Sequence, residues 1–186
     1  MDHFRPLPLM SHREMQYIKS LSLGKSHILE FGAGNSTLFW SKTYSKVTSV
    51  EHHLGWFNKI KTQIARKATN TQLLFASPES VAFSENGLLL AQLRNPTDYG
   101  TTAEFLSYLQ TSERLIMNLK TPCVILIDGP VRHQLLLLAL QSNINHEILM
   151  HDVVPERAYL NPWLPELNKH VVNIIDSLVH LRSHKN

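Results

Sequence analysis

The stretch Glu30-Phe31-Gly32-Ala33-Gly34-Asn35-Ser36-Thr37 decides the expected fold. It follows a short apolar run at 27–31 and leads into a segment with helical character at 36–45. Gly32 and Gly34 permit a tight turn that a ligand can approach closely. A helix that begins after such a turn presents free N–H groups and the positive end of its dipole. The stretch therefore predicts a strand–turn–helix unit that binds a ligand.

The rest of the chain alternates apolar runs with amphipathic segments. Strands are expected at 27–31, 47–50, 71–76, 124–127 and 147–150, and helices at 11–21, 36–45, 54–68, 102–117 and 131–141. Runs at 171–175 and 178–181 predict a C-terminal antiparallel hairpin. This order predicts an α/β fold, a Rossmann-like doubly wound and mostly parallel sheet flanked by helices. We expect one domain over 1–186, in which 1–26 form an N-terminal helical extension.

Composition narrows the class of protein. The chain has 186 residues, of which 43% are hydrophobic and 18% charged, so disorder and collagen-like repeats are excluded. A single cysteine excludes an internal disulfide. The net charge of +3, spread over the whole chain, produces only a weak electrostatic field, so a nucleic-acid partner is not favoured. No signal peptide or membrane-length apolar run is visible, so we expect a cytoplasmic protein without a membrane partner. The oligomeric state stays open.

Two acids lie where a nucleoside ligand would need them. Glu30 stands before the glycines, and Glu51 ends the second expected strand. An acid before the turn suits an amino group, and one at the second strand end accepts hydrogen bonds from both ribose hydroxyls. Thr37 replaces the third glycine of the dinucleotide motif, which disfavours a pyrophosphate. These acids favour S-adenosylmethionine over NAD, and the alternative is a generic α/β turn in which both acids cap helices.

A second group of polar residues follows the fourth and fifth expected strands. Asp128 comes directly after one, and His151 and Asp152 come after the other. Parallel strands end at one edge of the sheet, so these side chains are expected to face one pocket. They would orient and deprotonate an acceptor hydroxyl, or Asp128 and Asp152 would hold a divalent cation. The alternative is that Asp128 caps the next helix and Asp152 pairs with Arg157.

The chain contains 11 histidines, an unusual number for its length. Of these, His151 is the first candidate for binding or acid–base chemistry, with His52 and His133 after it, because all three stand near expected strand ends. Others, including His12 and His180, are expected at the surface or in the tails.

These residues resemble the class I S-adenosylmethionine-dependent methyltransferases over 11–181. The similarity is most specific to sugar O-methyltransferases of the plant glucuronoxylan 4-O-methyltransferase type. Their motifs F-G-x-G-x-x-S-x-x-W, I-D-x-P and H-D-V are matched at 31–40, 127–130 and 151–153. Ser36 is one place early, Trp56 follows the second-strand acid as in that family, and Arg157 is slightly displaced.

The resemblance implies an O-methyltransferase that uses S-adenosylmethionine on a hydroxyl of a sugar, a polysaccharide or another small polar acceptor. The cofactor contacts that it implies are Glu30, Gly32, Gly34, Glu51, His52 beside adenine, Asn35 and Ser36. Only 77–101 and 154–169 remain to build an acceptor site, which favours a small molecule or a glycan. The alternatives are a catalytically degenerate nucleoside-binding or scaffold protein, and a methyltransferase that acts on nucleic acid. Asp-Gly-Pro at 128–130 departs from the Asn/Asp-Pro-Pro-aromatic pattern of the DNA amino methyltransferases.

Overall fold

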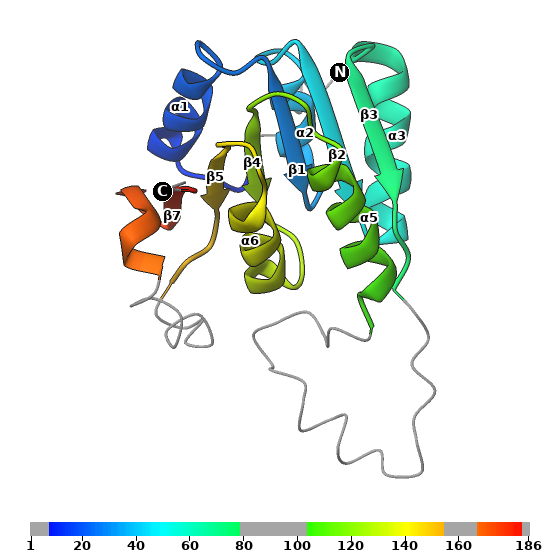
Figure 1. Cartoon of the computed structure of the whole chain (residues 1–186). Helices are drawn as coiled ribbons and strands as arrows, with labels where there is room; N and C mark the ends of the chain where they lie inside the picture. The colour runs from blue at the N-terminus through cyan, green and yellow to red at the C-terminus, as the bar shows by residue number, and fades with distance from the viewer. Residues whose placement is uncertain (1–7, 79–103, 155–166, 184–186) are drawn as a thin grey trace, which may run out of the picture.

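A computed structural model describes residues 8–78, 104–154 and 167–183 (Figure 1). Within these ranges it forms a seven-stranded sheet in the order β3-β2-β1-β4-β5-β7-β6. The strands are β1 (His27–Phe31), β2 (Lys46–Glu51), β3 (Thr71–Phe75), β4 (Val124–Ile127), β5 (Glu147–Met150), β6 (Val171–Ile175) and β7 (Leu178–Arg182). The first five strands run parallel, and β7 runs antiparallel to both β5 and β6. The expected mostly parallel sheet with a C-terminal hairpin is confirmed.

Helices cover both faces of the sheet (Figure 1). They are α1 (His12–Leu21), α2 (Asn35–Trp40), α3 (Leu54–Lys67), α5 (Leu106–Met117), α6 (Arg132–Gln141) and a 3-10 turn, η2 (Asn168–His170). α5 and α6 bury one apolar cluster against the sheet, and α1 and α2 bury another on the opposite face. None of the helices in the described ranges is long and apolar enough to cross a membrane.

The helix expected at 36–45 ends earlier, at Trp40. The chain then turns, and the amides of Thr43 and Tyr44 both donate to the Trp40 carbonyl. The side-chain amide of Asn70 donates to the carbonyls of Ser41 and Tyr44, so carbonyls that a longer helix would use are already satisfied. Arg157 and most of the segments 77–101 and 154–169 lie outside the described residues.

Strand alternation decides which face each residue meets. In β1, Leu29 and Phe31 belong to the cluster under α5 and α6, whereas Ile28 belongs to the cluster under α1 and α2. In β5, Leu149 points to the α1 and α2 face. Glu30 and His151 stand two residues further along these strands and therefore point to that same face.

Helix α1 joins the N-terminal part of the chain to the C-terminal hairpin. It begins with a capping box, which the spacing of Ser11 and Glu14, three residues apart, already indicates in the sequence. Ser11 Oγ accepts from the Glu14 amide at 3.1 Å, and Glu14 Oε2 accepts from the Ser11 amide at 2.7 Å. Ser11 Oγ also donates to Asp176 Oδ2 at 2.6 Å, and Arg13 pairs with Asp176 at 2.7 Å. Ser177 donates to Glu14 Oε1 through its amide and its hydroxyl. The capping box thus also docks α1 on the β6–β7 turn.

The expectation that His180 lies at the surface is wrong. Its side chain is buried because β7 lies inside the sheet, between β5 and β6. One ring nitrogen lies 2.7 Å from Tyr17 Oη, and the other lies 2.7 Å from Glu147 Oε2. His180 therefore helps to hold α1 against the sheet.

Replacement of Gly32 by alanine should destabilise the fold strongly. Gly32 has φ +104°, and a Cβ at this position would lie 2.7 Å from backbone atoms of Asp128 and Gly129. A cost of about 3 kcal/mol in the free energy of unfolding is expected from strain and overpacking. Urea unfolding monitored by circular dichroism measures it.

Gly34→Ala is the matched control in the same turn. Its backbone is extended, and the nearest atom to a new Cβ is Ser36 Oγ at 3.8 Å. The loss should stay below about 1 kcal/mol. Equal losses in the two variants would contradict the assignment of Gly32 to a close backbone approach.

Candidate functional site

A cavity of about 480 Å³ opens at the carboxyl ends of the parallel strands. Its size falls in the range of small-molecule sites. Its walls come from the turn after β1, the end of β2, the start of α3 and the residues that follow β4 and β5. It brings together the sequence-predicted residues Gly32, Gly34, Asn35, Ser36, Glu51, His52, Asp128, His151 and Asp152. Leu9, Met10 and Arg132 also line it, and the two apolar residues carry no motif from which their place was predictable.

Glu30 lies behind the glycine turn and outside the cavity wall. Its buried carboxylate accepts hydrogen bonds at 2.6 Å from the hydroxyls of Ser36, Thr37 and Ser49, and one at 3.1 Å from Trp40 Nε1. Burial raises the pKa of Glu30 to about 7, although the three hydroxyls act against this rise. Both oxygens are thus engaged by the protein itself. Glu30 therefore supports the glycine turn and does not make the direct contact with an amino group that the sequence predicts.

Glu51 and His52 form the wall at the end of β2. Glu51 Oε1 accepts from the His53 amide at 2.7 Å and lies 3.3 Å from His52 Nδ1. Burial raises the pKa of Glu51 to about 7 and lowers that of His52 to about 4. His52 is therefore neutral at pH 7, and its ring stands edge-on to Phe105 and Tyr108. This wall offers one carboxylate beside an aromatic surface.

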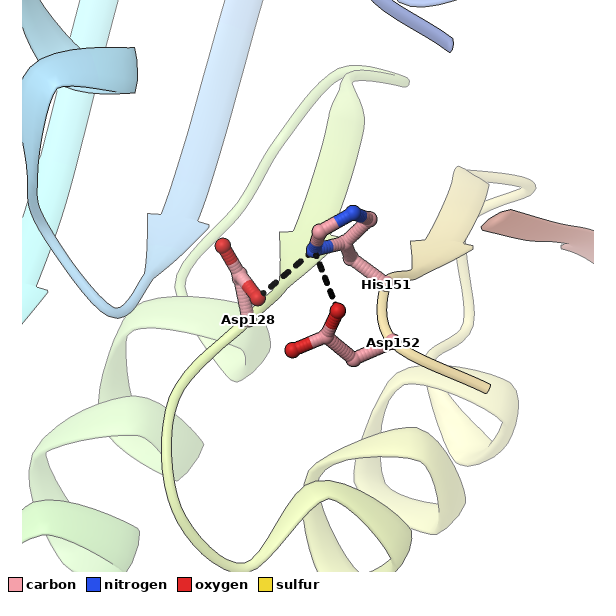
Figure 2. A group of neighbouring side chains, drawn as sticks. All are labelled: Asp128, His151 and Asp152. Atoms are coloured by element: carbon pink, nitrogen blue, oxygen red, sulfur yellow. Dashed lines mark hydrogen bonds and ion pairs between the residues drawn. The ribbon is translucent and has the colours of Figure 1, made fainter. Parts of the chain in front are cut away.

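Asp128, His151 and Asp152 converge as the sequence predicts (Figure 2). His151 Nδ1 lies 3.0 Å from Asp128 Oδ1 and 3.6 Å from Asp152 Oδ1. The other Asp128 oxygen points away from the ring (Figure 2). The helix-cap alternative for Asp128 is wrong, because α6 begins at Arg132, its N-cap residue is Val131, and no side chain caps it.

Arg132 lies between the two aspartates. Its guanidinium is 2% exposed, and Nη2 lies 3.3 Å from Asp128 Oδ1 and 3.6 Å from Asp152 Oδ2. The first turn of α6 therefore places a fixed positive charge beside both aspartates. Arg132 is one partner of Asp152, and the expected partner Arg157 lies outside the described residues.

His151 stands among three carboxylates. Besides the two aspartates at Nδ1, Glu14 Oε2 of α1 lies 3.5 Å from Nε2. Burial disfavours the charged ring, but the hydrogen bond to Asp128 and the surrounding negative charges outweigh it and raise the pKa of His151. The ring is thus suited to act as a fixed cation that holds Asp128, and less suited to act as a base.

The backbone beside the cluster is strained. Val131 and Asp152 have φ of +50° and +60°, a region that residues with a Cβ rarely adopt. Each such position costs about 1–3 kcal/mol and persists only where surrounding contacts impose it. Here Val131 precedes the buried Arg132, and Asp152 follows the buried His151, so the strain accompanies the positioning of both cations.

Known structures share this architecture, although no protein-family model and no curated protein sequence matches the chain. A methyltransferase-like protein from Silicibacter pomeroyi superposes with a TM-score of 0.65 at 20% identity, over 97% of this chain and 89% of that one. The O-methyltransferase from Bacillus cereus, solved with S-adenosylhomocysteine, gives 0.59 at 15% identity, over 94% and 84%. An rRNA methylase from Streptococcus thermophilus gives 0.54 at 12% identity, over 96% and 100%.

The chain has the Rossmann-like fold of these methyltransferases. At such identities the likeness establishes the fold. The three structures include an O-methyltransferase and an rRNA methylase, so the fold leaves the acceptor open.

Replacement of His151 by glutamine should destabilise the protein in a pH-dependent way. The folded state raises the pKa of His151, so the charged ring adds stability that is full below about pH 6.5 and is lost as the pH rises through the folded pKa. At pH 6 the variant should lose about 3 kcal/mol, because three carboxylates lose their shared cation. Guanidinium unfolding from pH 6 to pH 9 measures the difference.

His12→Gln is the matched control, since His12 is an exposed residue of α1. It should change the unfolding free energy by less than about 0.5 kcal/mol at every pH. A His151→Gln deficit that grows with pH would contradict a charged ring at this position.

Proposed function

We propose that this protein is an S-adenosylmethionine-dependent methyltransferase that acts on a hydroxyl of a small polar acceptor. One observation carries the proposal: Glu51 and the Asp128–His151 pair face the same cavity from opposite sides of the glycine turn. The first group suits a nucleoside, and the second suits proton removal from an acceptor. Because only the glycine turn separates these two groups, a cofactor and an acceptor bound to them would lie side by side, as methyl transfer between them requires.

The cofactor side fits S-adenosylmethionine on its own residues. Gly34 leaves room for close approach to the backbone, whereas Gly32 lets the turn pack against Asp128 and Gly129. Glu51 presents a carboxylate for two ribose hydroxyls. His52 Nδ1 is buried without a hydrogen-bond partner and lies on the wall proposed for adenine. When bound, the cofactor supplies an electrophilic methyl group.

On the acceptor side, Asp128 is the proposed base. Arg132 and His151 both hold its Oδ1, which leaves the second oxygen to accept the hydroxyl proton. The side chain is 24% exposed, so an acceptor can reach it from the cavity. His151 and Arg132 fix the carboxylate in one orientation, which lowers the cost of placing the base at the moment of reaction.

We propose that a divalent cation takes no part in this step. The ligand atoms of Asp128, His151 and Asp152 lie within 4.8 Å of one another, close enough for a single ion. Arg132 already bridges both carboxylates, however, and a metal-binding imidazole must be neutral. The raised pKa of His151 opposes that state.

The motif resemblance makes a sugar hydroxyl the first acceptor to test. Trp56 lines the cavity and offers an aromatic face of the kind that packs against sugar rings. The Lys59 ammonium group of α3 lies 4.1 Å from the centre of the Trp56 ring, so a positive charge also stands beside this part of the cavity wall. A nucleic-acid acceptor is therefore kept as an outcome of the screen described below.

Binding of S-adenosylhomocysteine should strengthen as the pH rises toward 7 and then level off. Ionised Glu51 accepts both ribose hydroxyls, and its pKa of about 7 places that change near neutrality. Glu51→Gln should bind about 10- to 100-fold more weakly at pH 8, with little pH dependence. Isothermal titration calorimetry from pH 5.5 to pH 8.5 measures both effects.

Glu113→Gln, an exposed position on α5, is the control and should bind like the unaltered protein. Absence of binding by the unaltered protein, or equal affinity in Glu51→Gln, would refute the cofactor assignment.

Asp128→Asn should abolish most methyl transfer and leave cofactor affinity almost unchanged. A screen with methyl-labelled S-adenosylmethionine over oligosaccharides, small phenols and RNA first identifies the acceptor. On that acceptor the loss in kcat should be about 10²- to 10⁴-fold, because the variant lacks the base. Affinity for S-adenosylhomocysteine should stay within about twofold of normal.

The same assay separates the alternatives. Turnover should be insensitive to EDTA, and its loss on chelation would restore the metal hypothesis. Label on RNA with steep salt dependence would indicate a nucleic-acid enzyme. Cofactor binding with no labelled acceptor would favour a scaffold protein over a transferase.

A further inference from the structure

Glu14 is a buried acid that lies outside the cavity wall. It belongs to the first turn of α1 and is 2% exposed. Its carboxylate nevertheless reaches the proposed acceptor side, because Oε2 lies 3.5 Å from His151 Nε2. Burial disfavours its ionised form, but hydrogen bonds from Ser11 and Ser177 and the charge of His151 outweigh this and lower the pKa of Glu14. It is therefore ionised at neutral pH.

The Glu14 carboxylate is held rigidly. The Ser11 amide donates to Oε2 at 2.7 Å, and Ser177 donates to Oε1 through its amide at 3.0 Å and its hydroxyl at 2.8 Å. These donors come from the start of α1 and from the β6–β7 turn. The amide of Val153, just after the cluster, donates to the Ser177 carbonyl at 2.9 Å. The turn therefore joins Glu14 to the segment that carries His151.

His151 is clamped between two sides of the molecule. Asp128 and Asp152 face Nδ1, Glu14 faces Nε2, and Arg132 lies beyond the aspartates. A ring with acids at both nitrogens has one favoured orientation, because each acid then faces a nitrogen that can donate to it. A flipped ring would place carbon atoms against Asp128 and Glu14, so without Glu14 the flip costs less and Nδ1–H holds Asp128 less firmly.

We infer that Glu14 is a positioning residue for methyl transfer: it fixes the His151 ring so that Nδ1–H holds Asp128 in place for the acceptor hydroxyl. This inference rests on the proposed function, since Asp128 is the base proposed there. Helix α1 is accordingly part of the catalytic apparatus, and its role goes beyond covering the sheet.

Glu14→Gln and Ser11→Ala form the test pair. Both disturb the capping box and the contact with the β6–β7 turn, but only Glu14→Gln removes the carboxylate from His151. The full chain is labelled with ¹⁵N in its histidine rings, and the His151 Nδ1–H signal is assigned by its absence in His151→Gln. S-adenosylhomocysteine affinity is measured by calorimetry, and turnover is measured on the acceptor found in the screen.

In Glu14→Gln, the His151 Nδ1–H signal should broaden or disappear, and kcat should fall about 10- to 100-fold. S-adenosylhomocysteine affinity should stay within about twofold, because the cofactor wall is untouched. Ser11→Ala should keep the ring signal and turn over within about twofold of the unaltered protein. Equal behaviour of the two variants in signal and turnover would overturn the inference.

Failure of the proposed function gives a different result. If the unaltered protein bound no S-adenosylhomocysteine, that function would fall, while the ring signals would still show whether Glu14 orients His151. An unchanged ring signal in Glu14→Gln would remove the positioning role even if cofactor binding and transfer were demonstrated.

Discussion

The buried carboxylate of Glu30 is the constraint on which the rest of the site depends. It joins β1 to α2 through Ser36, Thr37 and Trp40, and to β2 through Ser49. A buried acid is costly unless its oxygens are satisfied, and here four donors meet them. Because Glu30 precedes the glycine turn and three of its four donors follow directly after it, the turn has little freedom to move. The cavity wall therefore keeps its shape through a group that never touches the cavity.

Strand alternation extends this constraint to the other half of the site. Glu30 and Ser49 meet on the sheet face covered by α1 and α2, and His151 reaches Glu14 on that same face. Residues two apart along a strand share a face, so the residue at the carboxyl end of a strand points to the same face as the apolar residue two positions before it. For His151 that residue is Leu149, which packs under α1 and α2. The core packing and the direction of the proposed catalytic groups thus have one cause.

Much of the fold follows from the sequence, because apolar runs and the capping box are local signals. The strands β4, β5 and β6 begin and end where the sequence predicts, and the rule for carboxyl ends brings Asp128 to His151. The burial of His180, the insertion of Arg132 and the contact between Glu14 and His151 were not predictable in this way. Each depends on side chains from distant segments meeting within one packed layer. The Ser11–Glu14 capping box was visible, yet nothing local indicates that its acid also faces a strand end.

The charge balance of the cluster bears on the proposal that Asp128 acts as a base without a metal. Arg132 and His151 carry two positive charges against three carboxylates, those of Asp128, Asp152 and Glu14, which leaves a net charge of −1. Both cations contact Oδ1 of Asp128, which leaves its other oxygen as the one proposed to meet the acceptor hydroxyl. A divalent cation would add positive charge beside Arg132, and like charges at that separation repel strongly inside a protein. In the proposed mechanism the two built-in cations therefore provide the orientation that a metal ion would otherwise provide, and they hold Asp128 in place.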